Sequence, residues 1–333
     1  MKYIKTFILL FVSTFMVAQD GTRVFEFLNI TTSPRQAALG GNAQSMWDSD
    51  PNMSLWNPAL MNPKTHNHLA LNYVSYLSDI QFGTMSYVYQ WDKVKFFSIH
   101  GQYVDYGNFL QTDLIGNITG DFSAKDAAVT LGYARNLSDF FTVGINAKYI
   151  TSQIESYSSH GAAIDVGVVF HDIDYDTNIS LAARNIGVQF KPYDQETEKL
   201  PVQVNLGISH KLEHVPIELS ATLHDLQKFD ISEQVVENGQ ETSNIRKAVD
   251  HLSVGAELFP ERGFNVRVGY NFKRGNELGS DLTKNFSGLT AGFGLRVSAF
   301  KFEYAHVRYN SSANTNHIGI TVDLERFAGR RYY

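Results

Sequence analysis

From His66 onward, the chain is dominated by segments in which apolar and polar residues alternate. In the clearest segment, VQVNLGIS at residues 202–209, every even-numbered position is apolar and every odd-numbered position is polar or glycine. Successive side chains of a β-strand point to opposite faces, so a two-residue period predicts a strand with one apolar face. A chain built from many such strands must shield those faces from water, and this requirement restricts the possible folds.

The alternation predicts about fourteen strands, an even number as in single-chain bacterial barrels. They are expected at residues 66–76, 82–90, 94–104, 125–136, 140–153, 159–170, 177–186, 202–211, 215–226, 249–259, 263–274, 286–297, 300–309 and 314–326. Short connections alternate with longer ones, and the longest fall in the same set, at 105–124, 187–201, 227–248 and 275–285. Short turns at one end and long loops at the other are typical of outer-membrane barrels, whose long loops lie outside the cell.

The fold class predicted from this pattern is all-β, a transmembrane β-barrel of about fourteen antiparallel strands. Lipid offers the backbone no hydrogen-bond partner, so the sheet must close on itself. The apolar set then faces lipid and the polar set faces the lumen. We expect the lumen charges to form ion pairs, with selective ion conduction as the alternative. These charges are Lys148, Arg184, Glu218, Glu257, Arg267, Arg296, Lys301 and Glu303.

The first 65 residues do not follow the alternation and divide into two parts. Residues 1–18 combine lysines, a short apolar run and a final Ala18, which predicts a secretory signal peptide. The alternative, an uncleaved anchor, is disfavoured because the run is short for a spanning helix. We expect residues 19–65 to be a short helical plug that folds back from the periplasmic side into a barrel formed by residues 66–333.

The predicted plug contains two cap-then-proline signals and a glycine pair. Ser33 before Pro34 and Asn57 before Pro58 are each typical of the start of a helical turn. The glycines at 40–41 permit a tight exit or a close backbone approach inside a narrow lumen. The candidate plug motif consists of Arg35, Ala38, Leu39, Gly40, Gly41, Asn57, Pro58 and Ala59.

The stretch FEFLNITTSPRQAALGGNAQSMWDSDPNMSLWNPALM, at residues 25–61, resembles the start of type IX secretion system outer-membrane proteins of the PorQ and PorV group. These proteins are themselves similar to FadL-type barrels. The phrases YVSYLSDIQFGTMSYVY, YVDYGNF and GDFSAKDAAVTLGYA are closer to the PorQ branch of that group. The resemblance covers essentially the whole chain after residue 18.

This resemblance implies a non-enzymatic barrel in the outer membrane of a Gram-negative, Bacteroidota-type bacterium. Such a barrel would be a membrane scaffold for the cell-surface attachment complex, holding a PorZ-like surface protein near the sortase PorU and PorV, beside outer-membrane lipid and lipopolysaccharide. The alternative function is a FadL-like transporter of hydrophobic small molecules. A transporter should have a continuous apolar pocket beside the plug, near Met46, Trp47, Leu55 and Trp56.

The predicted loop 105–124 is the candidate partner-binding segment. It holds an apolar set that an exposed loop would not keep without a contact. This set is Tyr106, Phe109, Leu110, Leu114, Ile115 and Phe122. Folding over the barrel mouth is an equally good explanation of the same residues.

Enzymatic and metal-dependent functions find no support in the sequence. HExxH and GxSxG motifs are missing, and without cysteine neither thiol chemistry nor a cysteinyl metal site is available. The alternating acids of HDIDYDTN, at 171–178, fail as a calcium loop because Thr177 and Ala183 occupy the glycine and glutamate places. A net charge of −6 with interspersed basic residues offers no groove for nucleic acid. We expect no catalytic residue, cofactor or metal.

Overall fold

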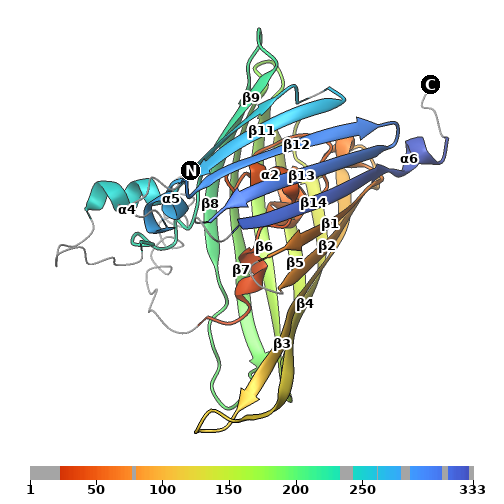
Figure 1. Cartoon of the computed structure of the whole chain (residues 1–333). Helices are drawn as coiled ribbons and strands as arrows, with labels where there is room; N and C mark the ends of the chain where they lie inside the picture. Colours follow the sequence, from red (N-terminus) through yellow and green to blue (C-terminus); the bar gives the residue numbers. More distant parts are fainter. Residues whose placement is uncertain are drawn as a thin grey trace, which may run out of the picture.

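The computed structural model describes residues 23–76, 80–232, 243–260, 262–278, 286–309 and 314–329 of the 333-residue chain. Within this part, fourteen antiparallel strands form a closed barrel in which each strand pairs with the next and β1 pairs with β14 (Figure 1). The predicted fold class is therefore confirmed. The signal peptide expected at residues 1–18 lies outside the described residues.

The strand bounds follow the alternation closely. The strands are β1 His68–Ser75, β2 Gln81–Gln90, β3 Lys95–Thr112, β4 Ile118–Asn136, β5 Phe141–Ile154, β6 Tyr157–Asp172, β7 Thr177–Lys191, β8 Gln203–Lys211, β9 Ile217–Leu223, β10 Leu252–Leu258, β11 Phe264–Asn271, β12 Leu289–Val297, β13 Phe300–Arg308 and β14 Asn314–Asp323. Only β3, β4 and β7 extend well beyond the expected bounds.

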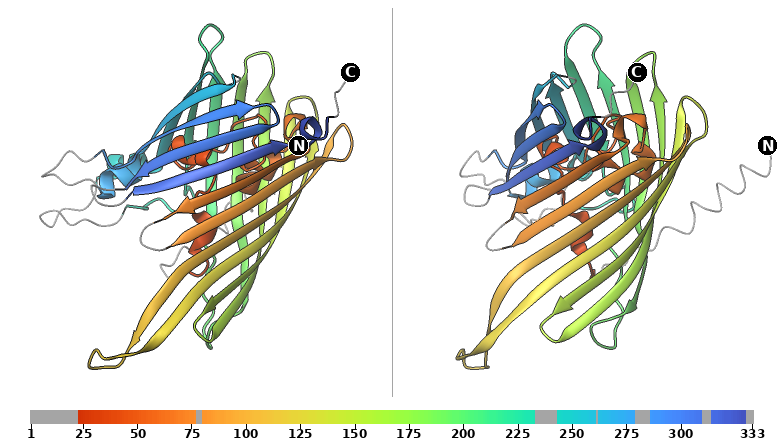
Figure 2. Two further views of the ribbon diagram at one scale, coloured as in Figure 1. Left: turned by 45° about the vertical axis from the view of Figure 1, so that its right-hand side comes forward. Right: turned by 90° about the vertical axis from the view of Figure 1, so that its right-hand side faces the viewer.

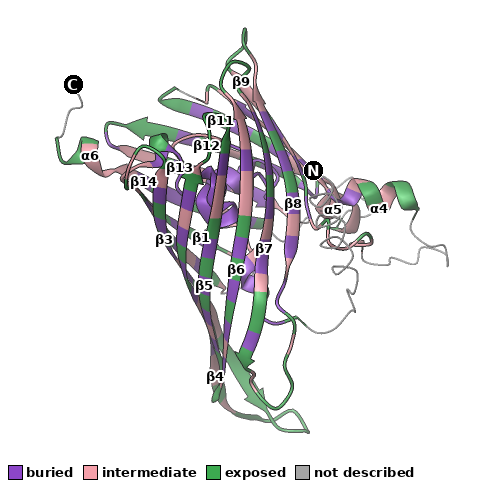
Figure 3. Ribbon diagram, turned by 180° about the vertical axis from the view of Figure 1, so that it is seen from behind, coloured by how far each residue is buried: buried purple, intermediate pink, exposed green. Residues whose placement is uncertain are grey.

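The two faces of the barrel wall differ as the alternation predicts. In β1, the side chains of Leu71 and Tyr73 are 49% and 44% exposed on the outer surface, whereas Asn72 between them is buried in the lumen. The same alternation of exposed and buried positions continues around the wall (Figure 3). An apolar outer surface on a closed sheet suits contact with lipid. Among the described residues, no helix is long and apolar enough to cross a membrane.

The segment before β1 runs through the lumen as five short helices (Figure 2). They are η1 Glu26–Asn29, α2 Pro34–Ala38, α3 Met53–Trp56, η2 Pro58–Leu60 and η3 Pro63–Thr65. We call the barrel end with the long connections the loop end, and the opposite end the turn end. Val24 N–H donates to the Lys199 carbonyl at the loop end (3.1 Å), and η3 leads into β1 at the turn end.

This path corrects one expectation about the plug. Instead of folding back from the periplasmic side, the described chain traverses the lumen from the loop end to the turn end. The apolar residues of VFEFL, at 24–28, account for this path because they pack with Val74 and Phe82 at the loop end.

The connections at the loop end contain structure that the alternation did not reveal. The segment expected as a loop at 105–124 is mostly paired, because β3 and β4 continue as a hairpin around a turn at 113–117. A β-bulge between Asp105 and Asn108 shifts the register and hides the two-residue period there. Two helices, α4 Asn244–Asp250 and α5 Phe272–Leu278, follow β9 and β11, and α6 Leu324–Phe327 follows β14.

The barrel orientation can be tested with single cysteines, because the natural chain has none. Arg23 lies at the loop end and His214 in the β8–β9 turn, and both side chains are exposed. If the long loops face outward, a membrane-impermeant maleimide added to intact cells will label Arg23→Cys. His214→Cys will be labelled only after the outer membrane is permeabilised. The reverse pattern of labelling would contradict the assigned orientation.

Candidate functional site

Helix α2 and the glycines after it pack against the wall formed by β11–β14. Ser33 caps the helix, since its hydroxyl accepts a hydrogen bond from the Gln36 N–H (3.4 Å). Gly40 and Gly41 both have φ of +91°, a left-handed conformation that glycine adopts without steric cost. Gly40 N–H then donates to the Thr290 hydroxyl in β12 (3.1 Å). The turn is therefore bonded directly to the barrel wall.

The wall is built from glycines where this turn touches it. A Cβ atom at Gly269 would overlap the backbone of Gly40, and one at Gly255 would lie 2.9 Å from the Leu39 Cβ. Side chains at these wall positions would push the plug out of place. The backbone of the plug and the backbone of the wall thus fit closely against each other.

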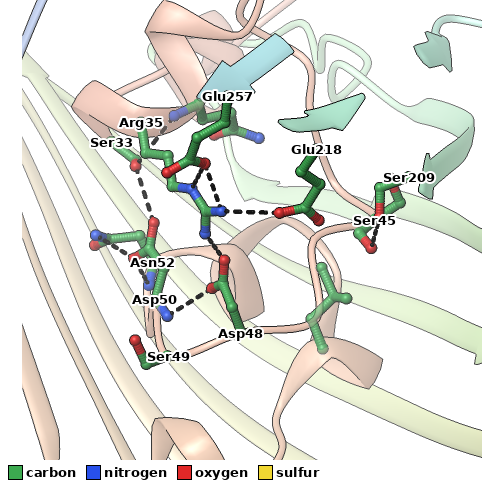
Figure 4. A network of polar contacts seen from close by, with 12 residues as sticks. Ser33, Arg35, Ser45, Asp48, Ser49, Asp50, Asn52, Ser209, Glu218 and Glu257 are labelled. Carbon is green, nitrogen blue, oxygen red and sulfur yellow. Dashed lines mark hydrogen bonds and ion pairs between the residues drawn. The ribbon is translucent and has the colours of Figure 1, made fainter. Parts of the chain in front are cut away.

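Arg35 in α2 is the centre of a buried ionic network (Figure 4). Its Nε and Nη2 atoms lie 2.8 and 2.7 Å from Oε2 of Glu257 in β10. Its Nη1 pairs with Asp48 of the plug, and its Nη2 lies 3.7 Å from Oε2 of Glu218 in β9. Three carboxylates around one buried guanidinium tie the plug to two neighbouring strands.

The network continues along the wall away from the plug. Glu257 Oε1 lies 3.1 Å from Arg267 Nη2, and Arg267 Nη1 lies 2.8 Å from Oε1 of Glu303. Lys301 Nζ completes the chain at 2.9 Å from the same Glu303 oxygen. The expected ion pairing of lumen charges is confirmed for these residues, and the alternating signs compensate the cost of burying each charge.

The second plug motif contacts the opposite wall. Asn57 caps η2 by accepting the Ala59 N–H (3.0 Å), and this turn lies against β4, β5 and β6. A Cβ atom at Gly144 would lie 2.5 Å from the Pro58 carbonyl carbon, and one at Gly167 would overlap the Asn57 side chain. The NPA turn therefore fits a second glycine-lined site.

A further polar cluster contacts the plug at Leu28 and Trp56. Lys148 in β5 and Asp165 in β6 form a fully buried ion pair of 2.8 Å. Arg184 in β7 donates to the Leu28 carbonyl (3.1 Å) and stacks on the Trp56 ring, with its Cζ atom 3.8 Å from the ring centroid. Asp165 was missed in the sequence analysis, although its alternate position in β6 places it on the lumen face.

The lumen near the loop end contains an apolar cluster. We define the loop-end cluster as the plug residues 24–28, except Glu26, together with the wall residues that enclose them. The wall residues are Val74, Phe82, Val104, Ala128, Ile150, Ala163 and Leu200. Charged side chains border it, because Arg184 donates to the Leu28 carbonyl and Asp126 accepts from the hydroxyl of Tyr106, which packs against the cluster. The loop end of the lumen therefore contains an apolar cluster within a partly polar wall, and smaller apolar clusters lie elsewhere in the lumen.

The turn end has a polar cavity of about 460 Å³. Trp47 lines it together with Lys64, His171, Arg296 and Lys301, and Trp47 stacks on the His171 ring at a centroid distance of 5.0 Å. The apolar pocket that a transporter should have near Met46, Trp47, Leu55 and Trp56 is not open there. Met46, Leu55 and Trp56 are 1–2% exposed. The loop-end cluster lies at the other end of the lumen.

The candidate plug residues all lie in the lumen, but they do not form one site. Residues 35–41 contact one wall and residues 57–59 contact the other. Their environment consists of ion pairs, caps and close glycine contacts, which hold a segment in place and carry no reactive group. In the described residues, no cluster of three or more His, Asp or Glu side chains could hold a metal ion.

No protein-family model and no curated protein sequence matches this chain. Solved structures do match. A FadL homologue of Pseudomonas aeruginosa is 11% identical, with 88% of this chain and 98% of that chain aligned and a TM-score of 0.54. The Pseudomonas putida toluene transporter TodX is 13% identical over 90% of this chain and 98% of that chain, with a TM-score of 0.51. A deltaS2 mutant of TodX, described as a monoaromatic hydrocarbon channel, is 12% identical over 88% and 97%, with a TM-score of 0.51.

These likenesses show the fold. The chain shares its closed β-barrel fold with these structures, and its own N-terminal segment lies in the lumen. The names of TodX and of its mutant describe those proteins as a toluene transporter and a hydrocarbon channel.

Replacing Glu257 by glutamine should destabilise the plugged barrel. The change leaves two buried guanidinium groups, of Arg35 and Arg267, without their shared carboxylate. Breaking a buried ionic contact of this kind costs about 3 kcal/mol in the free energy of unfolding. Denaturant unfolding in detergent micelles, followed by tryptophan fluorescence, measures it. The control Asp92→Asn breaks an exposed pair with Lys95 and should leave the transition unchanged, so equal shifts would contradict the assignment.

A matched pair of glycine variants tests the fit between plug and wall. Gly269→Ala puts a methyl group into the Gly40 backbone and should lower the free energy of unfolding by about 2 kcal/mol. Gly101→Ala lies in the same sheet with no atom within 4 Å of its added Cβ, and should be neutral or stabilising. The same unfolding assay compares them. If both variants unfold like the natural protein, the close approach at Gly269 is wrong.

Proposed function

We propose that this protein is a FadL-like outer-membrane channel that admits hydrophobic small molecules. The observation that carries the proposal is the loop-end cluster, because apolar side chains of the wall surround a short apolar segment of the plug there. A barrel used only as a rigid anchor does not require such a cluster, since buried ion pairs hold the plug elsewhere in the lumen. The fold shared with TodX and the FadL homologue supports the same function.

The chain itself already fills the loop-end cluster. Phe27 and Leu28 are 1% and 0% exposed there, and burial of side chains of this size stabilises by roughly 2 kcal/mol each. A hydrophobic ligand that binds the same wall offsets the cost of releasing them. Ligand entry and release of residues 24–28 are then two sides of one equilibrium.

The rest of the plug is suited to remain in place during such a release. Residues 33–41 are bonded to the wall through Arg35 and the glycine turn, and the NPA turn fits the opposite wall. By contrast, residues 24–28 contact the wall mainly through apolar side chains, which a ligand can replace. The expected moving part is therefore the short segment before Ser33.

Uptake of radiolabelled toluene by cells that express the protein tests this function, with a host that lacks its own hydrophobe channel as background. Ala128→Trp fills the loop-end cluster and should abolish the uptake that the natural protein supports. The control Val129→Trp places the same side chain on the adjacent outer position, which is 51% exposed, and should transport normally. A double variant Phe25→Ser with Phe27→Ser should raise uptake, because it weakens the internal occupant.

Two outcomes would count against the channel. One is toluene uptake no higher than in the empty host for the natural protein and for the Phe25/Phe27 variant alike. The other is equal uptake by the variants at residues 128 and 129. Heat-modifiable migration on gels shows in each case whether the barrel has folded.

A second candidate function is the scaffold implied by the resemblance to the PorQ and PorV group. One observation favours it: the hairpin that replaces the expected loop 105–124 projects from the loop end and exposes apolar residues. Phe109, Leu110, Leu114 and Ile115 are 42–106% exposed, while Tyr106 and Phe122 are partly buried. In this function the hairpin would hold a PorZ-like surface protein near PorU and PorV, above outer-membrane lipid and lipopolysaccharide.

A further inference from the structure

The barrel wall extends further on one side than on the other. β2 leaves β3 at the pair Gln81 and Asp105, and β8 leaves β7 at the pair Gln203 and Arg184. β3–β7 continue beyond these pairs, so they project past the closed part of the barrel, toward the bottom of Figures 1 and 2. β3 and β4 reach furthest, and residues 108–122 form a two-stranded ribbon that we call the hairpin tip.

The hairpin tip has unpaired backbone edges. β5 follows β4 only as far as the pair Ala124 and Ile154, and the Glu155 N–H closes the contact by donating to the Ser123 carbonyl (3.0 Å). Beyond that pair, toward the hairpin turn, residues 118–122 pair with β3 alone within the described part of the chain. An edge of this kind is a template for one more strand, and barrels otherwise leave none.

The hairpin tip is ordered from within and still exposes aliphatic residues. The rings of Phe109 and Phe122 stack at a centroid distance of 5.3 Å, and Gly116 takes φ of +88° in the turn. Leu110 and Ile118 on the two strands are 67% and 66% exposed. An isolated two-stranded ribbon is only marginally stable in water, so covering these residues would stabilise it.

The charge of the hairpin tip is wholly acidic. Between residues 106 and 124 the charged residues are Asp113 and Asp121. The next charged residue, Lys125, already pairs with Asp105, with its Nζ atom 3.9 Å from Oδ2. Hydrogen bonds from the Asn117 side chain and backbone lower the pKa of Asp113, so its carboxylate is ionised at neutral pH. A partner therefore needs basic side chains.

We propose that the outer edge of β4, at residues 118–122, binds an extended segment of another surface protein as an added β-strand. The segment carries an aliphatic residue that covers Ile118 and a lysine or arginine that faces Asp121. Both lie on one face of the edge, because a register shift between Gln111 and Thr112 places Ile118 and Asp121 on the same face. It lies beside β4 where β5 no longer pairs with it, beyond the pair Ala124 and Ile154. Backbone hydrogen bonds supply affinity and the alternating side chains supply selectivity. This surface is the one that the scaffold function requires, and it is independent of the channel.

The test uses a fluorescent seven-residue peptide in which lysine and isoleucine or valine take turns on one face, with threonine at the positions between them. Its binding to the protein in zwitterionic nanodiscs is measured by anisotropy, with empty nanodiscs as background. An added strand bonds through alternate amides on one side only. N-methylation of that set should abolish binding, whereas N-methylation of the other set should leave it. The control peptide with glutamate for lysine should not bind.

Protein variants locate the edge. Asp121→Asn should weaken peptide binding about threefold, as expected for the loss of one exposed charge pair. Ile118→Ser should weaken it further through the lost apolar contact, and its small size keeps the hairpin foldable. Asp139→Asn in the β4–β5 turn is the matched control at the opposite end of the barrel and should have no effect. Amide exchange of residues 118–122 should slow when the peptide binds.

Several results would overturn the proposal. They are binding that falls equally with either set of methylated amides, binding that ignores Asp121 and Ile118, and no binding above empty nanodiscs. Dimerisation of the protein through the hairpin tip would assign the edge to a second copy instead. Toluene uptake measured on the same variants separates the two functions, because the channel should be unaffected by changes at residues 118 and 121.

Discussion

A backbone that crosses lipid has no solvent to satisfy its N–H and C=O groups, and the closed ladder from β1 to β14 meets that constraint. Closure creates a second requirement, because a barrel of this size encloses a space that must be either filled or open to water. The N-terminal segment fills it, and the lumen wall is adapted to that segment at Gly255, Gly269, Gly144 and Gly167. The plug thus fills the space that closure creates.

The plug is held around Arg35 and around Phe27 and Leu28 by different physical interactions. Around Arg35, ion pairs with Glu257, Asp48 and Glu218 are directional and costly to break singly. Around Phe27 and Leu28, apolar contacts are strong in sum and not directional. One part of the plug is therefore held by ion pairs and another part mainly by apolar packing. The hairpin tip stands apart from both and faces outward.

The sequence predicted most of the wall and part of the lumen. Strands such as β8 were located within a few residues because one face contacts the apolar exterior and the other the polar interior, so every second residue reports its side. The caps at Ser33 and Asn57 were readable because their signals are local. The hairpin at 105–124 was not, since the bulge after Asp105 shifts the period and both ribbon faces are exposed. The partner of Arg35 was not predictable either, because Glu257 lies 222 residues away.

The sequence by itself determined that the chain closes into a membrane barrel and that its first part is different, because periodicity and caps depend only on neighbouring residues. Only the tertiary structure decided that the plug crosses the lumen from the loop end, that VFEFL packs in an apolar cluster, and that β3 and β4 extend beyond their neighbours. Those outcomes depend on contacts between residues far apart in the chain, where shape and charge must match across the lumen.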